Sequence, residues 1–306
     1  MLFHFYFCKS TNEQYTNTEL DNLNLSQVYN QYRSKHNLPF PDEIKRIRDK
    51  YNLPATKMSE ILGFGINSYR NYESGEVPSD SNAKLIKMAS DPLQFKNLVN
   101  ESVELEVSFK EKLIGKIVEL IAQEERSKSK FFEILLFNHE KPDEYCGYRK
   151  PDLGRITEMI VFFTEKMEPY KVKMNKILFY VDFLMFKKSA HSISGMSYRA
   201  VAMGPILSDY DTIFAYACRN NHVDICETKF PEGGIGEQFL PNSKRKFNKE
   251  LFSQNEIDVM QEIATKFKKI KTNAIVDMSH KEKGWKENEK KKKLISYNYA
   301  FELNQV

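Results

Sequence analysis

The segment from residue 172 to 186 constrains the fold of this chain more than any other. Its apolar residues recur at helical spacing and cover a face too wide for a surface helix. They are Met174, Ile177, Leu178, Val181, Leu184 and Met185. A helix with such a face must lie inside a core. This pattern therefore predicts that the C-terminal half is a helical domain built around the segment.

Length and composition bound the class of protein. A chain of 306 residues corresponds to about two domains, and 41% hydrophobic with 29% charged residues is typical of a globular protein. No apolar run approaches the roughly 18 residues of a spanning helix, and the apolar start from Met1 to Cys8 lacks a basic head and a cleavage site. We expect a cytoplasmic protein that does not contact the membrane.

The cysteines and the net charge give no sign of a metal or cofactor. Cys8, Cys146, Cys218 and Cys226 include no CxxC pair, which predicts reduced thiols, no disulfide framework and no zinc site. The net charge of +4 neither demands nor excludes a nucleic-acid partner. We therefore expect no metal and no cofactor.

Helix-breaking residues and hydrophobic periodicity divide the chain into four segments and predict a mainly helical fold. Residues 1–40 read as a strand and a helix, and 41–100 as short helices packed in a compact five-helix bundle. Residues 101–154 read as a helical linker, with one long helix over 101–130. Residues 155–306 read as a mostly helical α+β domain with a small antiparallel sheet.

The short helices of residues 41–100 suggest a helix-turn-helix. Gly63-Phe64-Gly65 separates two of them, and Ile66, Tyr69 and Tyr72 form the buried stripe of the second. The residues left to contact DNA are Asn67, Ser68, Arg70, Asn71 and Lys57. Asn can pair with adenine and Arg with guanine. The alternative is an ordinary polar helix face. Nine basic against eight acidic residues over 42–100 give almost no net charge, so binding to DNA would release few counterions and gain little from that release.

The stretch from Pro54 to Gly75 resembles the Xre/Cro family, in particular the subclass fused to a zinc ribbon in MqsA-type antitoxins. The resemblance implies that Asn67 reads a base and that Arg48 is a structural partner of Glu73. Ala55 stands where the family places a DNA-contacting Gln, and Asn71 where MqsA-type helices carry a base-reading Arg. Residues 5–20 are similar to the end of that zinc ribbon, but only one cysteine of the set remains, which implies a degenerate remnant without zinc.

The C-terminal segment contains a series of motifs that run from Lys173 to Phe183, Tyr198 to Ile206 and Met278 to Trp285, and close with Ile295-Ser296-Tyr297. In order and spacing these motifs resemble the Panacea (SocA-like) domain of antitoxins. The resemblance implies a surface that binds a toxin and no active site, with Gly204-Pro205 shaping a turn. The motif residues expected to be structural or toxin-facing are Lys176, Tyr180, Asp182, Gly204, Pro205, His280 and Trp285.

These likenesses predict an antitoxin of a type II toxin–antitoxin system. Its Panacea domain would bind the cognate toxin, and its helix-turn-helix would bind operator DNA as a homodimer, with the helix over 101–130 as a candidate contact. One alternative is a transcriptional regulator whose C-terminal domain senses something other than a toxin. A third hypothesis is an acid–base enzyme using His280 with Asp182, although no nucleophile or phosphate-binding motif occurs in residues 155–306.

Overall fold

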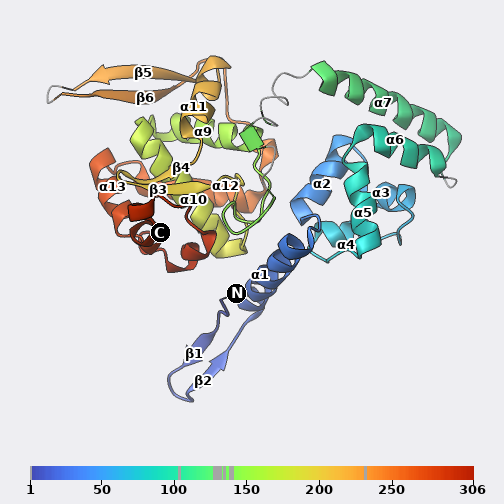
Figure 1. Ribbon diagram of the computed structural model, residues 1–306, viewed down its shortest axis with the longest axis horizontal. Helices are drawn as coiled ribbons and strands as arrows, with labels where there is room; N and C mark the ends of the chain where they lie inside the picture. The colour runs from blue at the N-terminus through green and yellow to red at the C-terminus, as the bar shows by residue number, and fades with distance from the viewer. Residues whose placement is uncertain (1, 103–104, 127–132, 134–135, 138–140, 231–232) are drawn as a thin grey trace. The chain divides into compact units, whose positions relative to one another are not determined.

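The computed structural model describes residues 2–102, 105–126, 133, 136–137, 141–230 and 233–306 (Figure 1). The described chain is mainly helical and contains three separate two-stranded antiparallel sheets, which confirms the predicted fold class. It divides into two compact units, Met1–Lys141 and Pro142–Val306. None of the described helices is both long enough and apolar enough to span a bilayer.

The first unit opens with a hairpin and a long helix. Strands β1 (Tyr6–Cys8) and β2 (Glu13–Tyr15) pair antiparallel, so the single strand expected here is in fact two. Helix α1 (Thr18–His36) begins where the Asn17 side chain accepts a hydrogen bond from the Leu20 amide, and it ends at Asn37 in the left-handed conformation. Both ends are typical helix caps.

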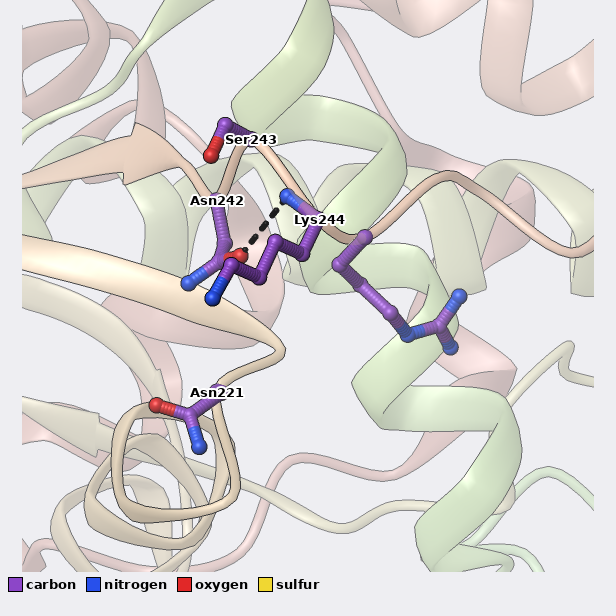
Figure 2. A pocket seen from close by; sticks show the side chains of 5 residues that line it. Asn221, Asn242, Ser243 and Lys244 are labelled. Carbon is purple, nitrogen blue, oxygen red and sulfur yellow. Dashed lines mark hydrogen bonds between the residues drawn. The ribbon is translucent and has the colours of Figure 1, made fainter.

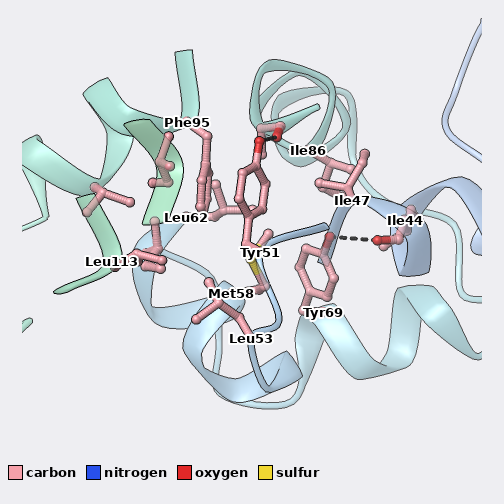
Figure 3. Close-up of a cluster of buried hydrophobic side chains, with 14 of the residues drawn as sticks. Ile44, Ile47, Tyr51, Leu53, Met58, Leu62, Tyr69, Ile86, Phe95 and Leu113 are labelled. Atoms are coloured by element: carbon pink, nitrogen blue, oxygen red, sulfur yellow. Dashed lines mark hydrogen bonds between the residues drawn. The ribbon is translucent and has the colours of Figure 1, made fainter. Parts of the chain in front are cut away.

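Five shorter helices follow and pack around a shared apolar core (Figure 3). They are α2 (Pro41–Lys50), α3 (Ala55–Ile61), α4 (Ser68–Glu73), α5 (Asp80–Ala89) and α6 (Pro92–Glu101). Two buried tyrosines cross-link the core, since the Tyr51 hydroxyl donates to Ala89 O at 2.7 Å and the Tyr69 hydroxyl to Ile44 O at 2.8 Å. Helices this short are stable only through such packing.

Helix α7 (Val107–Arg126) completes this core with Leu113 and Ile117. The long helix predicted over 101–130 is present but shorter: α6 ends at Glu101, Ser102 is extended, and α7 packs against α6 of its own unit. Residues 103–104 and 127–130 lie outside the described residues. Of the apolar stripe on which the prediction rested, Leu113 and Ile117 are buried, whereas Val107 is 70% exposed.

The second unit alternates helices and two hairpins. Its α-helices are α9 (Leu153–Met167), α10 (Lys171–Ser189), α11 (Tyr210–Arg219), α12 (Gln254–Phe267), α13 (Thr272–His280) and α14 (Lys283–Asn288). Its strands are β3 (Tyr198–Val201), β4 (Gly204–Leu207), β5 (Val223–Lys229) and β6 (Ile235–Pro241). Short 3-10 turns are η1 (Lys249–Leu251), η2 (Glu289–Lys291) and η3 (Tyr297–Glu302). In Figure 1, β5 and β6 form a ribbon that extends beyond the helices of this unit.

Helix α10 is the centre of the second unit, as its apolar face predicts. Every residue from Lys173 to Phe186 is buried, and α12, α13, β4 and η3 pack around it. A helix enclosed in this way carries its polar side chains into the core, where each one needs a partner.

One local prediction for this unit is wrong. Gly204 and Pro205 do not form the turn but begin strand β4, opposite Val201 and Ala200, and the reversal falls at residues 202–203. Nearer the chain end, α14 ends at Asn288, and the turn η2 after it ends at the left-handed Lys292. The chain then bridges β3 at Arg199 and Leu294.

Candidate functional site

Lys176 places a buried amine at the junction of α10 and the β3–β4 hairpin. Its side chain is fully buried, and its Nζ donates to Pro205 O at 2.9 Å. Burial lowers the pKa of Lys176 to about 7 from an ordinary 10.5. Desolvation disfavours the charged form of such an amine, so Lys176 loses most of its charge just above neutral pH.

Gly204 allows the hairpin to approach α10 and α13 closely. Its φ is +93°, and a Cβ there would lie 2.7 Å from Lys176 Cε and overlap the Ser279 hydroxyl. Both the conformation and the lack of space require glycine. The Gly-Pro pair therefore belongs to an interior contact between three elements.

His280 and Trp285 form a stacked pair beside the same hairpin. Their ring centroids are 4.1 Å apart with planes at 16°, and Trp285 Nε1 donates to Val201 O at 2.7 Å. Both side chains are only partly buried. The buried Nε2 of His280 has no hydrogen-bond partner among the described residues.

Asp182 lies fully buried in a second polar cluster. It accepts hydrogen bonds from the Ile193 amide at 2.8 Å, the Ser194 amide at 2.9 Å, the Ser194 hydroxyl, and the Tyr198 hydroxyl at 2.8 Å. Burial raises the pKa of Asp182 above its ordinary value, although these donors oppose the shift. The carboxyl group thereby holds the loop before β3 against α10.

A second buried acid, Glu282, ties the chain end to the core. It accepts hydrogen bonds from the Tyr180 hydroxyl at 3.2 Å and from the amides of Asn304 at 3.0 Å and Gln305 at 3.2 Å. Burial raises the pKa of Glu282. Sequence reasoning missed Glu282, Ser194 and Ser279 because hydrogen-bond partners of buried groups follow no periodicity.

The seven Panacea motif residues divide into two groups by exposure. Five of them are buried: Lys176, Tyr180, Asp182, Gly204 and Pro205. His280 and Trp285 reach the surface in part, and exposed Met203 stands at the hairpin tip, two residues from the carbonyl that binds Trp285. Only this second group has side-chain surface that a partner could contact.

The residues predicted to contact DNA surround α4 in the first unit. Asn67, Arg70 and Asn71 are exposed and Ser68 is partly buried. Lys57 forms an ion pair with Glu60 at 2.7 Å and lies over the Phe109 ring.

One expectation about α4 is wrong and another is confirmed. Tyr69 and Tyr72 are buried, but Ile66 is 72% exposed, because it precedes the helix and points away from the core. The Arg48–Glu73 pair is present, with Arg48 Nε 2.6 Å from Glu73 Oε1.

Side chains that could bind a metal do not gather in the described part of the chain, where no group of three or more His, Cys, Asp or Glu residues is suitably placed. A surface cavity of about 380 Å³ is lined by Asn221, Asn242, Ser243, Lys244 and Arg245 (Figure 2). Its lining side chains are all of polar type, and two of them, Lys244 and Arg245, also contribute alkyl stems to the wall.

Comparison with known families finds a match within the second unit. Residues 174–286 match the family model described as antitoxin SocA-like, Panacea domain. The matched segment begins in α10, includes both hairpins, and contains all seven motif residues. The second unit thus carries a SocA-like Panacea domain of the antitoxin type. No curated protein and no solved structure matches the chain.

Replacing Gly204 tests the close approach of the hairpin. Gly204→Ala should lower the free energy of unfolding by about 3 kcal/mol or more, through backbone strain and overlap with Ser279. The measurement is urea unfolding followed by fluorescence of Trp285, the only tryptophan, which reports on the second unit. Gly233→Ala is the control: its φ is also +93° but a Cβ meets nothing within 4 Å, so about 1 kcal/mol is expected. Equal losses would contradict the packing argument.

Stability should depend on pH through Lys176. Between its folded pKa of about 7 and the ordinary 10.5, the unfolded chain binds a proton that the folded chain does not. The free energy of unfolding should therefore rise from pH 7.5 to 9, by about 2 kcal/mol for this residue. Lys176→Met should remove that rise, whereas Lys188→Met, an exposed lysine of the same helix, should retain it. An unchanged slope in Lys176→Met would show that the buried amine stays charged.

Proposed function

We propose that this protein is an antitoxin that neutralises a protein toxin by binding it directly through its Panacea domain. The observation that carries the proposal is the family match over residues 174–286. The buried Lys176, Asp182 and Glu282 support a non-catalytic role, because their polar atoms are bound by the backbone or by other side chains. Inhibition would be stoichiometric, by covering the toxin.

The surface best suited to the toxin is formed by Met203, His280 and Trp285. Tryptophan is enriched at the energetic centres of interfaces, and methionine adapts to irregular partners. Met203 is 55% exposed, and the stacked His280–Trp285 pair is fixed by the hydrogen bond to Val201. A rigid aromatic pair beside a flexible apolar side chain provides an anchor for a protein partner.

The enzyme hypothesis receives no geometric support from its two residues. Asp182 is enclosed by donors from Ile193, Ser194 and Tyr198, and burial raises its pKa. His280 instead stacks on Trp285. A general acid and base must reach the same reacting group, so this pair does not form a catalytic site.

The first unit would bind operator DNA as part of a homodimer. Asn67, Arg70 and Asn71 present amide and guanidinium groups suited to base edges, and exposed Ile66 adds an apolar group that can contact a thymine methyl. Because Lys57 is paired with Glu60, we expect it to contribute less to phosphate binding than its position suggests. Two copies on a palindromic operator would double these contacts.

The alternative, a regulator whose C-terminal domain senses a small molecule, finds less support. The cavity of Figure 2 is lined only by polar side chains, and its Arg245 is bound to the buried Glu158.

Growth rescue tests the antitoxin function. Expression of the neighbouring open reading frame alone should stop growth, and co-expression with the full chain or with residues 142–306 should restore it. The fragment starts at 142 because the second compact unit does. Residues 1–141 are the matched control and should not rescue.

A surface variant makes the same assay more specific. Met203→Glu should abolish rescue by placing a charge in the toxin contact, while Ile235→Glu, at an equally exposed apolar residue of the β5–β6 ribbon, should rescue normally. A harmless neighbouring gene, or no rescue by the full chain, would favour the regulator. Rescue by Met203→Glu would place the toxin elsewhere on the domain.

DNA binding is tested by Asn67→Ala. Loss of one base contact should weaken binding to the upstream region by about 5- to 150-fold, equivalent to 1–3 kcal/mol. The measurement is fluorescence anisotropy at fixed salt. Asn100→Ala is the control, since Asn100 is exposed on α6 of the same unit but lies outside the α4 surface. Equal affinities for Asn67→Ala and the wild type would exclude α4 as the reading element.

A further inference from the structure

Helix α1 has an inverted pattern of burial. Its four buried residues are all polar: Asn24, Gln27, Asn30 and Arg33. Several of its apolar residues face solvent, with Leu25, Val28 and Tyr32 at 49%, 42% and 46% exposure, whereas Leu20 and Leu23 are partly buried. A helix of a folded unit normally shows the opposite arrangement, so this pattern indicates a missing partner on the apolar side.

The polar side of α1 is already occupied by its own chain. The Asn24 side chain exchanges two hydrogen bonds with the backbone of His4, at 2.8 and 2.9 Å. The Gln27 side chain does the same with Leu2, at 3.2 and 3.0 Å. At the other end, Arg33 donates to Gly75 O at 2.5 Å and anchors α1 to the loop after α4. The helix is thus held in place with its apolar face outward.

Exposed apolar side chains are concentrated around α1. Ten of the 20 large apolar side chains that are exposed in the described chain lie within residues 2–32. With 40–57% of each exposed and a full side-chain surface of about 200 Å², they total roughly 1,000 Å². This total is shared between two faces of the β1–β2 hairpin, because Tyr6 and Phe7 are successive strand residues and point to opposite sides. A standard interface needs about 800 Å² per partner. The side chains on α1 alone supply less than half of this, so the interface must continue onto residues 2–15.

The charges of α1 match a second copy in antiparallel orientation. Asp21, Leu25, Val28, Tyr32 and Lys35 follow one another at steps of four and three, so they share one face of the helix. Asp21 precedes Val28 by seven residues and Lys35 follows it by seven. A two-fold axis near Val28 therefore brings Asp21 of each copy beside Lys35 of the other, and Leu25 near Tyr32. A two-fold interface requires this kind of self-complementarity.

We propose that this chain forms a two-fold homodimer through the exposed face of α1 and the adjoining residues 2–15. The proposal deepens the homodimer part of the proposed function by naming its surface. Helix α7, the contact expected from the sequence, has Leu113 and Ile117 of its apolar stripe in the core of its own unit.

The test is sedimentation equilibrium of the full chain at micromolar concentration. The wild type should be a dimer, and Val28→Glu should raise the dissociation constant by about 100-fold or more, because two carboxylates meet at the axis. Leu93→Glu, at an exposed apolar residue of α6, is the matched control and should remain dimeric. Far-ultraviolet circular dichroism checks that each variant is folded.

A charge exchange tests the orientation of the two helices. Asp21→Lys and Lys35→Asp should each weaken the dimer by about tenfold, because like charges then face each other at two symmetric places. The double exchange should restore the wild-type affinity. Both positions are exposed, so the monomer fold should be unaffected. Failure of the double variant to recover would overturn the antiparallel arrangement.

The remaining outcomes separate this proposal from the antitoxin function. A monomeric wild type overturns the homodimer, and a dimer insensitive to Val28→Glu overturns the surface; neither affects growth rescue. If the wild type is monomeric and Val28→Glu abolishes rescue, the toxin occupies this face. If the wild type is a dimer but does not rescue, the interface stands and the antitoxin function fails.

Discussion

The second unit depends on the complete burial of α10. Because fourteen consecutive residues, Lys173–Phe186, are enclosed, each polar side chain among them must bind a group from another element. Lys176 takes the carbonyl of Pro205, Asp182 the amides and hydroxyl before β3, and Tyr180 the carboxylate of Glu282. These bonds connect the hairpin, the preceding loop and the chain end to one helix. The buried members of the motif therefore maintain the scaffold.

Periodicity predicted the elements whose burial follows from their own side chains, namely the core position of α10 and the short helices of the first unit. The Arg48–Glu73 pair, which is also present, was expected from the Xre/Cro resemblance and not from periodicity. Sequence reasoning failed where distant groups decide the local conformation. Gly204 reads as a turn residue, yet it lies in a strand, at a place where Lys176 and Ser279 leave no space for a Cβ. Ile66 continues an apolar pattern, but the helix begins only after it.

The two units also differ in how the candidate sites could be found. The α4 side chains were predicted from one short helix whose outward face is local. The pairing of His280 with Trp285, and of both with Val201, depends on α13, α14 and β3 meeting in space. No spacing within the sequence encodes that Met203 stands at the tip of this hairpin. The inverted burial of α1 likewise depends on a distant group, because its polar residues are buried against the backbone of residues 2–4.

The paired hydrogen bonds that the Asn24 and Gln27 side-chain amides make with the backbone limit how the N-terminal segment can vary. They bind main-chain atoms of His4 and Leu2, so the side chains at these two positions are not recognised by the pairing. Substitutions there should preserve the attachment of the segment to α1. An inserted or deleted residue between positions 2 and 4 would instead shift one amide pair out of register and turn the following side chains to the opposite side. This part of the protein should tolerate changes of residue type better than changes of length.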